Sequence, residues 1–281
     1  IIMNNLLIID CYGSLLSRGG GYTAISTFKR YEKKYLITKE QLDKILPLLL
    51  ERMELDEYCI GGKEYRIYSI YYDTVNHDVI RSNSQGLTYK EKMRIRSYYP
   101  VTDPEDTVFM ELKKKSEKVG NKRRIKIKLR EIEPFVNDGV LPETKNYLSG
   151  QVAKELAYFL KMNKVQPALY VQYDRLALFG KEDKNFRMTF DRNVRTRRSN
   201  FVFGESDEDE LLLPDDMYIM EIKILGAMPL WMTAILSENK LYSRGFSKYG
   251  VRYKRDSQDG KLNYYLTDKN GKQIDFDFFE D

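Results

Sequence analysis

Apolar and charged residues alternate along the segment KRRIKIKLRE, residues 122–131, in which Ile125, Ile127 and Leu129 separate Arg124, Lys126, Lys128 and Arg130. Side chains of a β-strand point alternately to its two faces, so this segment predicts a strand with a cationic face and an aliphatic face. Similar segments recur between turns that contain Gly, Pro or Asp, which predicts further strands. These segments are residues 27–38, 64–74, 87–99, 106–116, 168–178, 186–198 and 217–225.

Helical periodicity appears in three places between the predicted strands. Thr38 is placed to cap a helix over residues 39–53, whose apolar residues share one face, and further helices are predicted over 150–164 and 229–240. We expect loops at DTVNHDVI, which contains His77, and at SRGFSKYGVRYKR, which contains two glycines. The tail, residues 260–281, is predicted to form a final hairpin.

The whole pattern predicts a mainly β, α+β fold. About eight strands joined mostly by short turns close most simply into an antiparallel β-barrel, or tunnel, with inserted and flanking helices, because closure leaves no exposed strand edge. The opening, residues 1–22, ends in three glycines and is expected to be a leader or peripheral segment before a single domain over residues 23–281. Its apolar runs are far shorter than the roughly 20 residues of a membrane span.

Composition limits the kinds of partner and metal site that we expect. The chain has 47 basic and 42 acidic residues, a net charge of +5, so bulk charge alone indicates neither a nucleic-acid nor a membrane partner. Two cysteines and one histidine, with no metal-type spacing, argue against a Cys/His zinc site and leave oxygen-ligated Mg²⁺ or Mn²⁺ open. The low cysteine count is typical of a reducing compartment, and a cytoplasmic location is expected.

Charge concentrates on one face of several predicted strands. Side-chain parity places Glu32 with Lys34 on one face of the first strand. It also places the following groups on shared faces, each opposite an apolar face: Lys92, Arg94 and Arg96; Glu111 with Lys113; Arg187 with Asp191; and Glu221 with Lys223. A solvated outer face is the alternative interpretation for any single strand. If the charged faces point inward together, the enclosed cations would need a bound polyanion, and the few carboxylates would suit a divalent ion that bridges to phosphate.

The motifs YEKKY, RIR, ELKKK, YDR, FDRN, MEIKI and SKYG resemble, in this order, the VTC-type polyphosphate polymerase domain. This family is a branch of the triphosphate tunnel metalloenzymes, which include CYTH phosphatases and cyclases. The resemblance covers about residues 26–255 and rests on the order of the motifs, with SKYG the most specific of them. It implies an antiparallel tunnel that transfers the γ-phosphate of ATP to a growing polyphosphate chain with Mn²⁺ or Mg²⁺.

The resemblance also implies roles for individual residues. Lys34, Arg94 and Arg96 would bind nucleotide phosphates, and Lys113 with Lys126 or Lys128 would line the product path. Arg175 and Arg187 would hold the transferred group, and Lys248 would close over the phosphates beside Ser247. Lys223 joins the predicted phosphate-binding set, and the predicted metal ligands are Glu221, Glu32 and Glu111.

The sequence departs from the family at one motif. A CYTH enzyme would carry ExExK in its first strand, whereas position 30 is Arg and only Glu32 and Lys34 remain, which favours the polymerase branch. A triphosphatase or nucleotide cyclase of the same fold, or a non-catalytic module that binds polyphosphate or inositol phosphates, stays as an alternative. No specific nucleic-acid partner is expected, because the basic residues alternate with apolar ones. Any membrane partner would be a separate protein.

Overall fold

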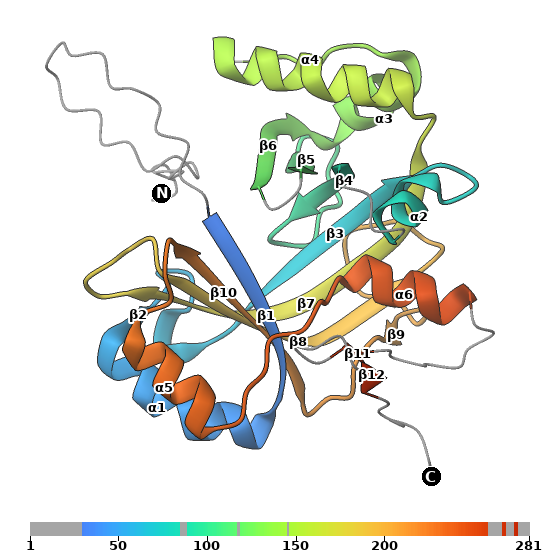
Figure 1. The fold of residues 1–281 in the computed structure, drawn as a ribbon. Coiled ribbons are helices and arrows are strands. Elements are labelled where there is room, and N and C mark those ends of the chain that lie inside the picture. Colours follow the sequence, from blue (N-terminus) through green and yellow to red (C-terminus); the bar gives the residue numbers. More distant parts are fainter. Residues whose placement is uncertain are drawn as a thin grey trace, which may run out of the picture.

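The protein is described here by a computed structural model that defines residues 30–84, 89–116, 119–144, 146–257, 266–267 and 273–274. The predicted leader, residues 1–22, lies outside the described residues. A single ten-stranded antiparallel sheet dominates the described part (Figure 1). None of its helices is long and apolar enough to cross a membrane.

The sheet follows the strand order β1-β10-β8-β7-β3-β4-β5-β6, with β2 beside β7 and β9 beside β8. Its strands are β1 (Arg30–Thr38), β2 (Met53–Leu55), β3 (Tyr65–Asp73), β4 (Tyr89–Ser97), β5 (Thr107–Ser116), β6 (Val119–Lys128), β7 (Gln166–Gly180), β8 (Arg187–Arg197), β9 (Glu210–Leu211) and β10 (Met217–Leu225). Every ladder between them is antiparallel, as predicted. A short pair in the tail, β11 (Leu266–Thr267) with β12 (Gln273–Ile274), agrees with the predicted final hairpin.

The sheet is not closed into a barrel, so the predicted closure is wrong. β1 and β6 end the strand order and come near one another without forming a ladder. An ion pair spans the gap, from Lys113 Nζ on β5 to Glu32 Oε2 on β1 at 3.4 Å. Alternation tells which face a side chain occupies, but closure also depends on the tilt and stagger of the strands, and alternation does not encode these.

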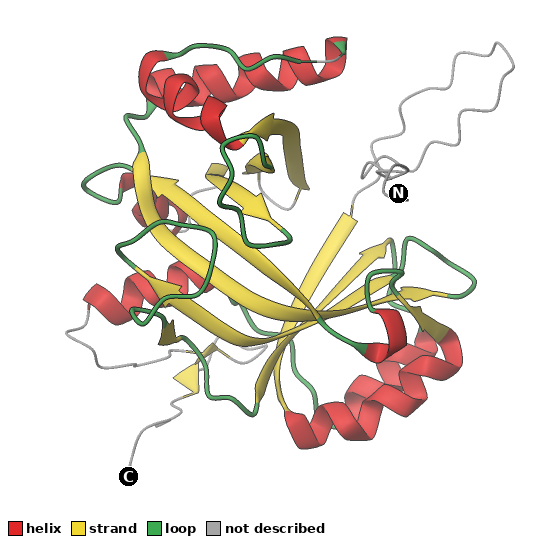
Figure 2. Ribbon diagram, turned by 180° about the vertical axis from the view of Figure 1, so that it is seen from behind, coloured by secondary structure: helices red, strands yellow, loops and turns green. Residues whose placement is uncertain are grey.

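Two helices cover the outer face of β1, β10, β8 and β7 (Figure 2). Helix α1 (Lys39–Arg52) begins with the predicted cap, because Thr38 Oγ1 accepts from Gln41 N at 3.2 Å and Gln41 Oε1 accepts from Thr38 N at 3.0 Å. Its apolar side and helix α5 (Leu230–Glu238) pack on the apolar faces of these strands. The apolar faces therefore point outward into a helix-covered core.

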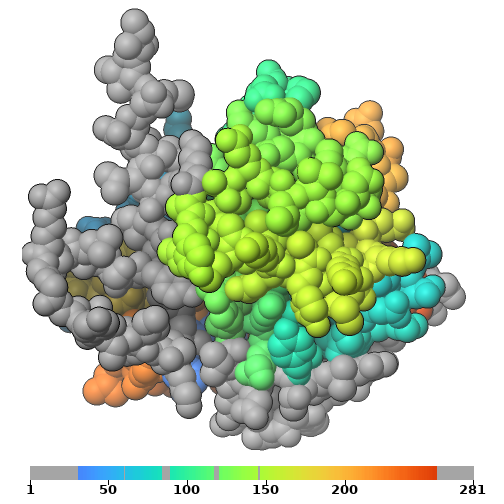
Figure 3. Space-filling view, turned by 90° about the horizontal axis from the view of Figure 1, so that it is seen from above, coloured from blue at the N-terminus to red at the C-terminus, as the bar shows by residue number. Residues whose placement is uncertain are grey.

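A second pair of helices covers the outer face of β3 to β6. Helices α3 (Ile132–Asp138) and α4 (Tyr147–Met162) pack Phe135, Leu156 and Phe159 on the apolar faces of these strands. Seen from above, the yellow-green part of the chain covers much of this side of the molecule (Figure 3). With both outer faces covered by helices, the charged faces of the strands are left to meet on the concave side.

Two predicted loops contain helices. The segment SRGFSKYGVRYKR contributes most of α6 (Lys248–Ser257), and DTVNHDVI contains the start of α2 (Asp78–Ser84). Ser247 caps helix α6, because its Oγ accepts from Gly250 N at 3.2 Å, and the helix buries Tyr249 in a third apolar core within the concave side. This burial outweighs the low helix propensity of Gly250.

The strand predicted over residues 122–131 ends three residues earlier than expected. β6 stops at Lys128, and Leu129–Glu131 form a 3-10 turn that leads into α3. Arg130 is therefore not on the cationic face of the strand and instead pairs with Glu105.

Candidate functional site

The charged faces of the strands meet on the concave side of the sheet. Arg96 of β4 donates to Tyr173 Oη of β7 at 3.2 Å, although β3 lies between these strands, so the sheet curves around this space. We call the following residues the cationic face: Lys34, Lys92, Arg94, Arg96, Lys113, Lys122, Arg124, Arg175, Lys223 and Lys248. Glu32, Glu111, Asp191 and Glu221 lie among them, so cations outnumber carboxylates.

Glu111 is enclosed by three of these cations. Its side chain is 1% exposed, and its oxygens lie 2.7 Å from Arg94, 3.3 Å from Lys122 Nζ and 3.5 Å from Arg124 Nε. Burial alone would raise the pKa of Glu111, but the surrounding cations, Arg94 first, hold it well below its usual range. Glu111 is therefore ionised, and it fixes Arg94 of β4 and Arg124 of β6, the two strands that flank β5.

Glu32 and Glu221 share Lys34. Lys34 Nζ lies 3.2 Å from Glu32 Oε1 and 3.6 Å from Glu221 Oε2, and Lys223 Nζ lies 2.6 Å from the other oxygen of Glu221. Burial opposes ionisation of both carboxyl groups, yet the neighbouring lysines lower the pKa of each, and that of Glu221 strongly. Two ionised carboxylates on adjacent strands thus face a common point.

Asp191 joins helix α6 to the sheet. Arg175 grips it with two hydrogen bonds of 2.6 and 2.8 Å, and Lys248 Nζ, at the start of α6, donates to it at 2.5 Å. Burial would raise the pKa of Asp191, but Arg175 and Lys248 lower it to about 2. Lys248 of SKYG therefore lies in the cationic face. The next residue of the motif, Tyr249, donates to the buried Asp73 at 2.6 Å.

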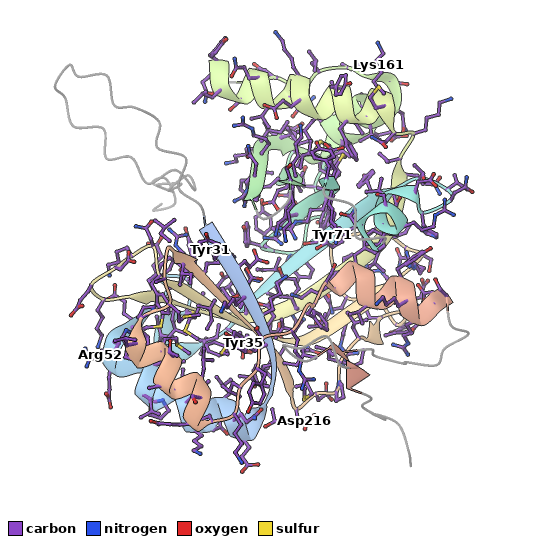
Figure 4. The ribbon with its side chains drawn as sticks, in the orientation of Figure 1. Tyr31, Tyr35, Arg52, Tyr71, Lys161 and Asp216 are labelled. Carbon is purple, nitrogen blue, oxygen red and sulfur yellow. The ribbon has the colours of Figure 1, made fainter. Side chains whose placement is uncertain are left out.

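Of the three residues that β4 contributes to the cationic face, Lys92 and Arg96 have no carboxylate partner in the described part of the chain. Arg96 contacts the hydroxyls of Ser69 and Tyr173, and Lys92 Nζ contacts Ser247 Oγ at 2.9 Å. Beside them Tyr71 of β3 accepts from Arg94 at 3.0 Å (Figure 4). Burial by itself would raise the pKa of Tyr71, but Arg94, Arg96 and Lys248 lower it to about 7.

Lys92 and Tyr71 are absent from the predicted site residues. The parity of β4 already placed Lys92 beside Arg94 and Arg96, so the sequence held a signal for it. Tyr71 stands in the Tyr-rich stretch IYSIYYD, where nothing distinguishes it from tyrosines that pack in the outer core.

Three predicted residues lie away from these contacts. Lys126 is exposed, Lys128 Nζ pairs with Glu105 at 3.1 Å in the turn before β5, and Arg187 stacks on Phe179 near the β7–β8 hairpin. Ser247 caps α6 and touches Lys92, which places it at the edge of the cationic face.

The three predicted metal ligands, Glu32, Glu111 and Glu221, are not equally suited to bind a divalent ion. No group of three or more His, Cys, Asp or Glu residues in the described part of the chain could hold a metal by itself. Mg²⁺ commonly takes one or two carboxylates and completes its shell with water and phosphate oxygens, and the Glu32–Glu221 pair fits that role. Glu111 fits less well, because its oxygens already face three cations.

A family model for the VTC domain matches residues 29–255. No curated protein matches the chain. Among solved structures, the chain is similar to a Bacillus halodurans protein described as a "putative adenylate cyclase", with a TM-score of 0.45 and 12% identity over 78% of this chain and 95% of the other. A Vibrio parahaemolyticus protein with the same description gives a TM-score of 0.40 and 12% identity over 78% and 94%.

Proposed function

The chain belongs to the VTC domain family, and on that premise we propose that it is a metal-dependent polyphosphate polymerase. It would transfer the γ-phosphate of ATP to a growing polyphosphate chain along the cationic face. The observation that carries the proposal is the excess of cations over carboxylates on a concave surface. Such a surface stabilises a polyanion, and phosphoryl transfer needs mainly positioning and charge neutralisation from the protein.

In the proposed reaction, Arg94, Arg96 and Lys34 bind the nucleotide phosphates. Arg175 and Lys248 hold the transferred phosphoryl group. Both already converge on the buried carboxylate of Asp191, and their remaining N–H groups can donate to phosphate oxygens. Lys113 and Lys126, which are exposed near the open edge, guide the product chain. Arg187 and Lys223, neighbours across β8 and β10, extend the same face.

A divalent ion, Mg²⁺ or Mn²⁺, would be held by Glu32 and Glu221. When bound, it would neutralise charge on phosphate oxygens that these carboxylates would otherwise repel. Lys34, which contacts both carboxylates, keeps them ionised and oriented.

Incubation of the purified protein with ATP and Mn²⁺, with and without a short polyphosphate primer, tests the proposal on a gel stained for polyphosphate. A ladder of growing chains is expected from the unmodified protein and from Arg81→Ala, which removes an exposed arginine of α2. Loss of the ladder is expected in Arg94→Ala and Glu221→Gln, because these remove a phosphate ligand and a metal ligand.

Other outcomes separate the alternatives. Release of orthophosphate or pyrophosphate without a ladder would replace the polymerase by a triphosphatase or a cyclase. Tight binding of polyphosphate or inositol phosphates without turnover would indicate a binding module, and in that case binding would persist after removal of divalent metal with EDTA.

A further inference from the structure

Lys92 is a partly buried cation whose described hydrogen-bond partner is neutral. Arg94, the next cation along this face of β4, ion-pairs with Glu111, and cations across the concave side pair with Asp191, Glu32 or Glu221. Arg96 resembles Lys92 in having hydroxyl partners, but its guanidinium group contacts two of them. Lys92 Nζ instead donates to Ser247 Oγ at 2.9 Å. A partly buried ammonium group whose described partner is a hydroxyl is poorly compensated for the water it has lost, so an anion at this point would stabilise it.

The charged groups around Lys92 further disfavour its ammonium form in the absence of an anion. Lys34 of β1, Lys113 of β5 and Lys90 of β4 repel its charge, and Tyr71 of β3 is the group that favours it. Burial first, and then these lysines, lower the pKa of Lys92 to about 8.

Ser247 adds a second hydrogen-bonding group at the same place. A hydroxyl has one proton to donate and two lone pairs that accept. Lys92 Nζ and Gly250 N occupy the accepting positions of Ser247 Oγ at 2.9 and 3.2 Å, so its own proton can be donated to an anion. Ser247 also stays in place as the cap of α6 if Lys92 turns away from it.

We propose that Lys92 is a further phosphate-binding residue of the cationic face, and that its ammonium group turns from Ser247 to the anion when polyphosphate binds. This rests on the proposed function only in taking the cationic face as a phosphate-binding surface; it does not require turnover. Because an adjacent anion favours the charged form of a lysine, binding should be coupled to proton uptake. Proton uptake by Lys92 is expected near and above pH 8. It should vanish well below pH 8, where Lys92 is already protonated before the anion binds.

Titration calorimetry with inorganic triphosphate at pH 8.5, in two buffers of different ionisation enthalpy, measures both affinity and proton uptake. The unmodified protein is expected to take up more protons than Lys92→Arg, which binds with its charge permanently present. Lys92→Met should bind about 10- to 100-fold more weakly, the usual effect of losing a hydrogen bond to a charged group. Protonation of the triphosphate itself and of Tyr71 contributes in every variant, so the difference between variants reports Lys92.

Lys33→Met is the matched control, because Lys33 lies exposed on the opposite face of β1 and the change in charge is the same. It should bind like the unmodified protein. Equal affinity in Lys92→Met, or equal proton uptake in Lys92→Arg, would overturn the inference, and so would an absence of triphosphate binding by the unmodified protein. Lys92-dependent binding without polymer formation would leave the inference standing and contradict only the polymerase.

Discussion

At the scale of single residues, the carboxylates on the concave side act as counter-ions that let cations from separate strands lie close together. Glu111 brings together Arg94 of β4 and Lys122 and Arg124 of β6. Asp191 does the same for Arg175 of β7 and Lys248 of α6. Since buried charges are stable when paired, the loss of either carboxylate exposes the repulsion between its partners.

Glu111→Gln is therefore expected to lower the free energy of unfolding by about 3–5 kcal/mol, the usual cost of leaving buried charges unpaired. Urea denaturation measures this change, and added triphosphate should restore part of it by supplying another counter-ion. Glu105→Gln is the control, because Glu105 is 57% exposed and solvent screens its pairs with Lys128 and Arg130, which should therefore contribute little to stability. Similar losses in the two variants would contradict the assignment.

Asp191 predicts a specific acid dependence. Its pKa is lowered from 3.8 to about 2 in the folded state, so its stabilising effect is present above about pH 4 and is lost as pH falls toward 2. The loss is on the order of 2 kcal/mol. Urea denaturation between pH 5 and 2 should give a shallower fall in stability for Asp191→Asn than for the unmodified protein, although the variant is less stable at pH 7. Parallel pH profiles would contradict this.

At the scale of elements, helix α6 fastens the concave face to the remainder of the fold. Tyr249 Oη donates to Asp73 Oδ2, and Asp73 also accepts from Val79 N and Ile80 N at the start of α2. One buried carboxylate thus joins α6, α2 and β3. The position of Lys248, one residue before Tyr249, depends on this junction.

Tyr249→Phe should lower the free energy of unfolding by about 1–3 kcal/mol, because the buried carboxylate of Asp73 loses one of its donors. It should also increase hydrogen exchange of the α6 amides and weaken triphosphate binding through Lys248. Hydrogen-exchange mass spectrometry and calorimetry measure these effects. Tyr253→Phe removes a hydroxyl from the same helix, at a ring that packs against His77, and should leave triphosphate binding unchanged. An unchanged affinity in Tyr249→Phe would show that Lys248 does not depend on the junction.

At the scale of the whole molecule, helices cover the outside of an open, curved sheet and leave the charged faces of its strands on the inside. The excess of cations there disfavours the folded state until an anion binds. The gap between β1 and β6 is spanned by the Lys113–Glu32 pair, which is partly exposed and so contributes little to closure.

Polyanions should consequently stabilise the whole fold. Inorganic triphosphate at 100 times its dissociation constant should raise the free energy of unfolding by about 2.7 kcal/mol, and high salt should reduce the gain by screening. Thermal unfolding in 50 and 500 mM NaCl, with and without triphosphate, measures this effect, and sodium sulfate at matched ionic strength is the control. Equal stabilisation by sulfate would indicate a general salt effect and no phosphate site.

The eight long strands, the outer helices α1, α4 and α5, and the parity that places Arg94, Glu111 and Glu221 on charged faces could be predicted from the sequence, because they follow from local alternation and capping. The short strands β2 and β9 are not among these predictions. The order of short motifs in the sequence also indicated the family. Parity also places Lys92 on a charged face, and the fold adds its contact with Ser247. The open sheet, the helix at SKYG and the place of Tyr71 in the site emerge only from tertiary packing. These outcomes depend on strand stagger and on burial against distant residues, such as Asp73 beneath Tyr249, and neighbouring residues in the chain do not encode either.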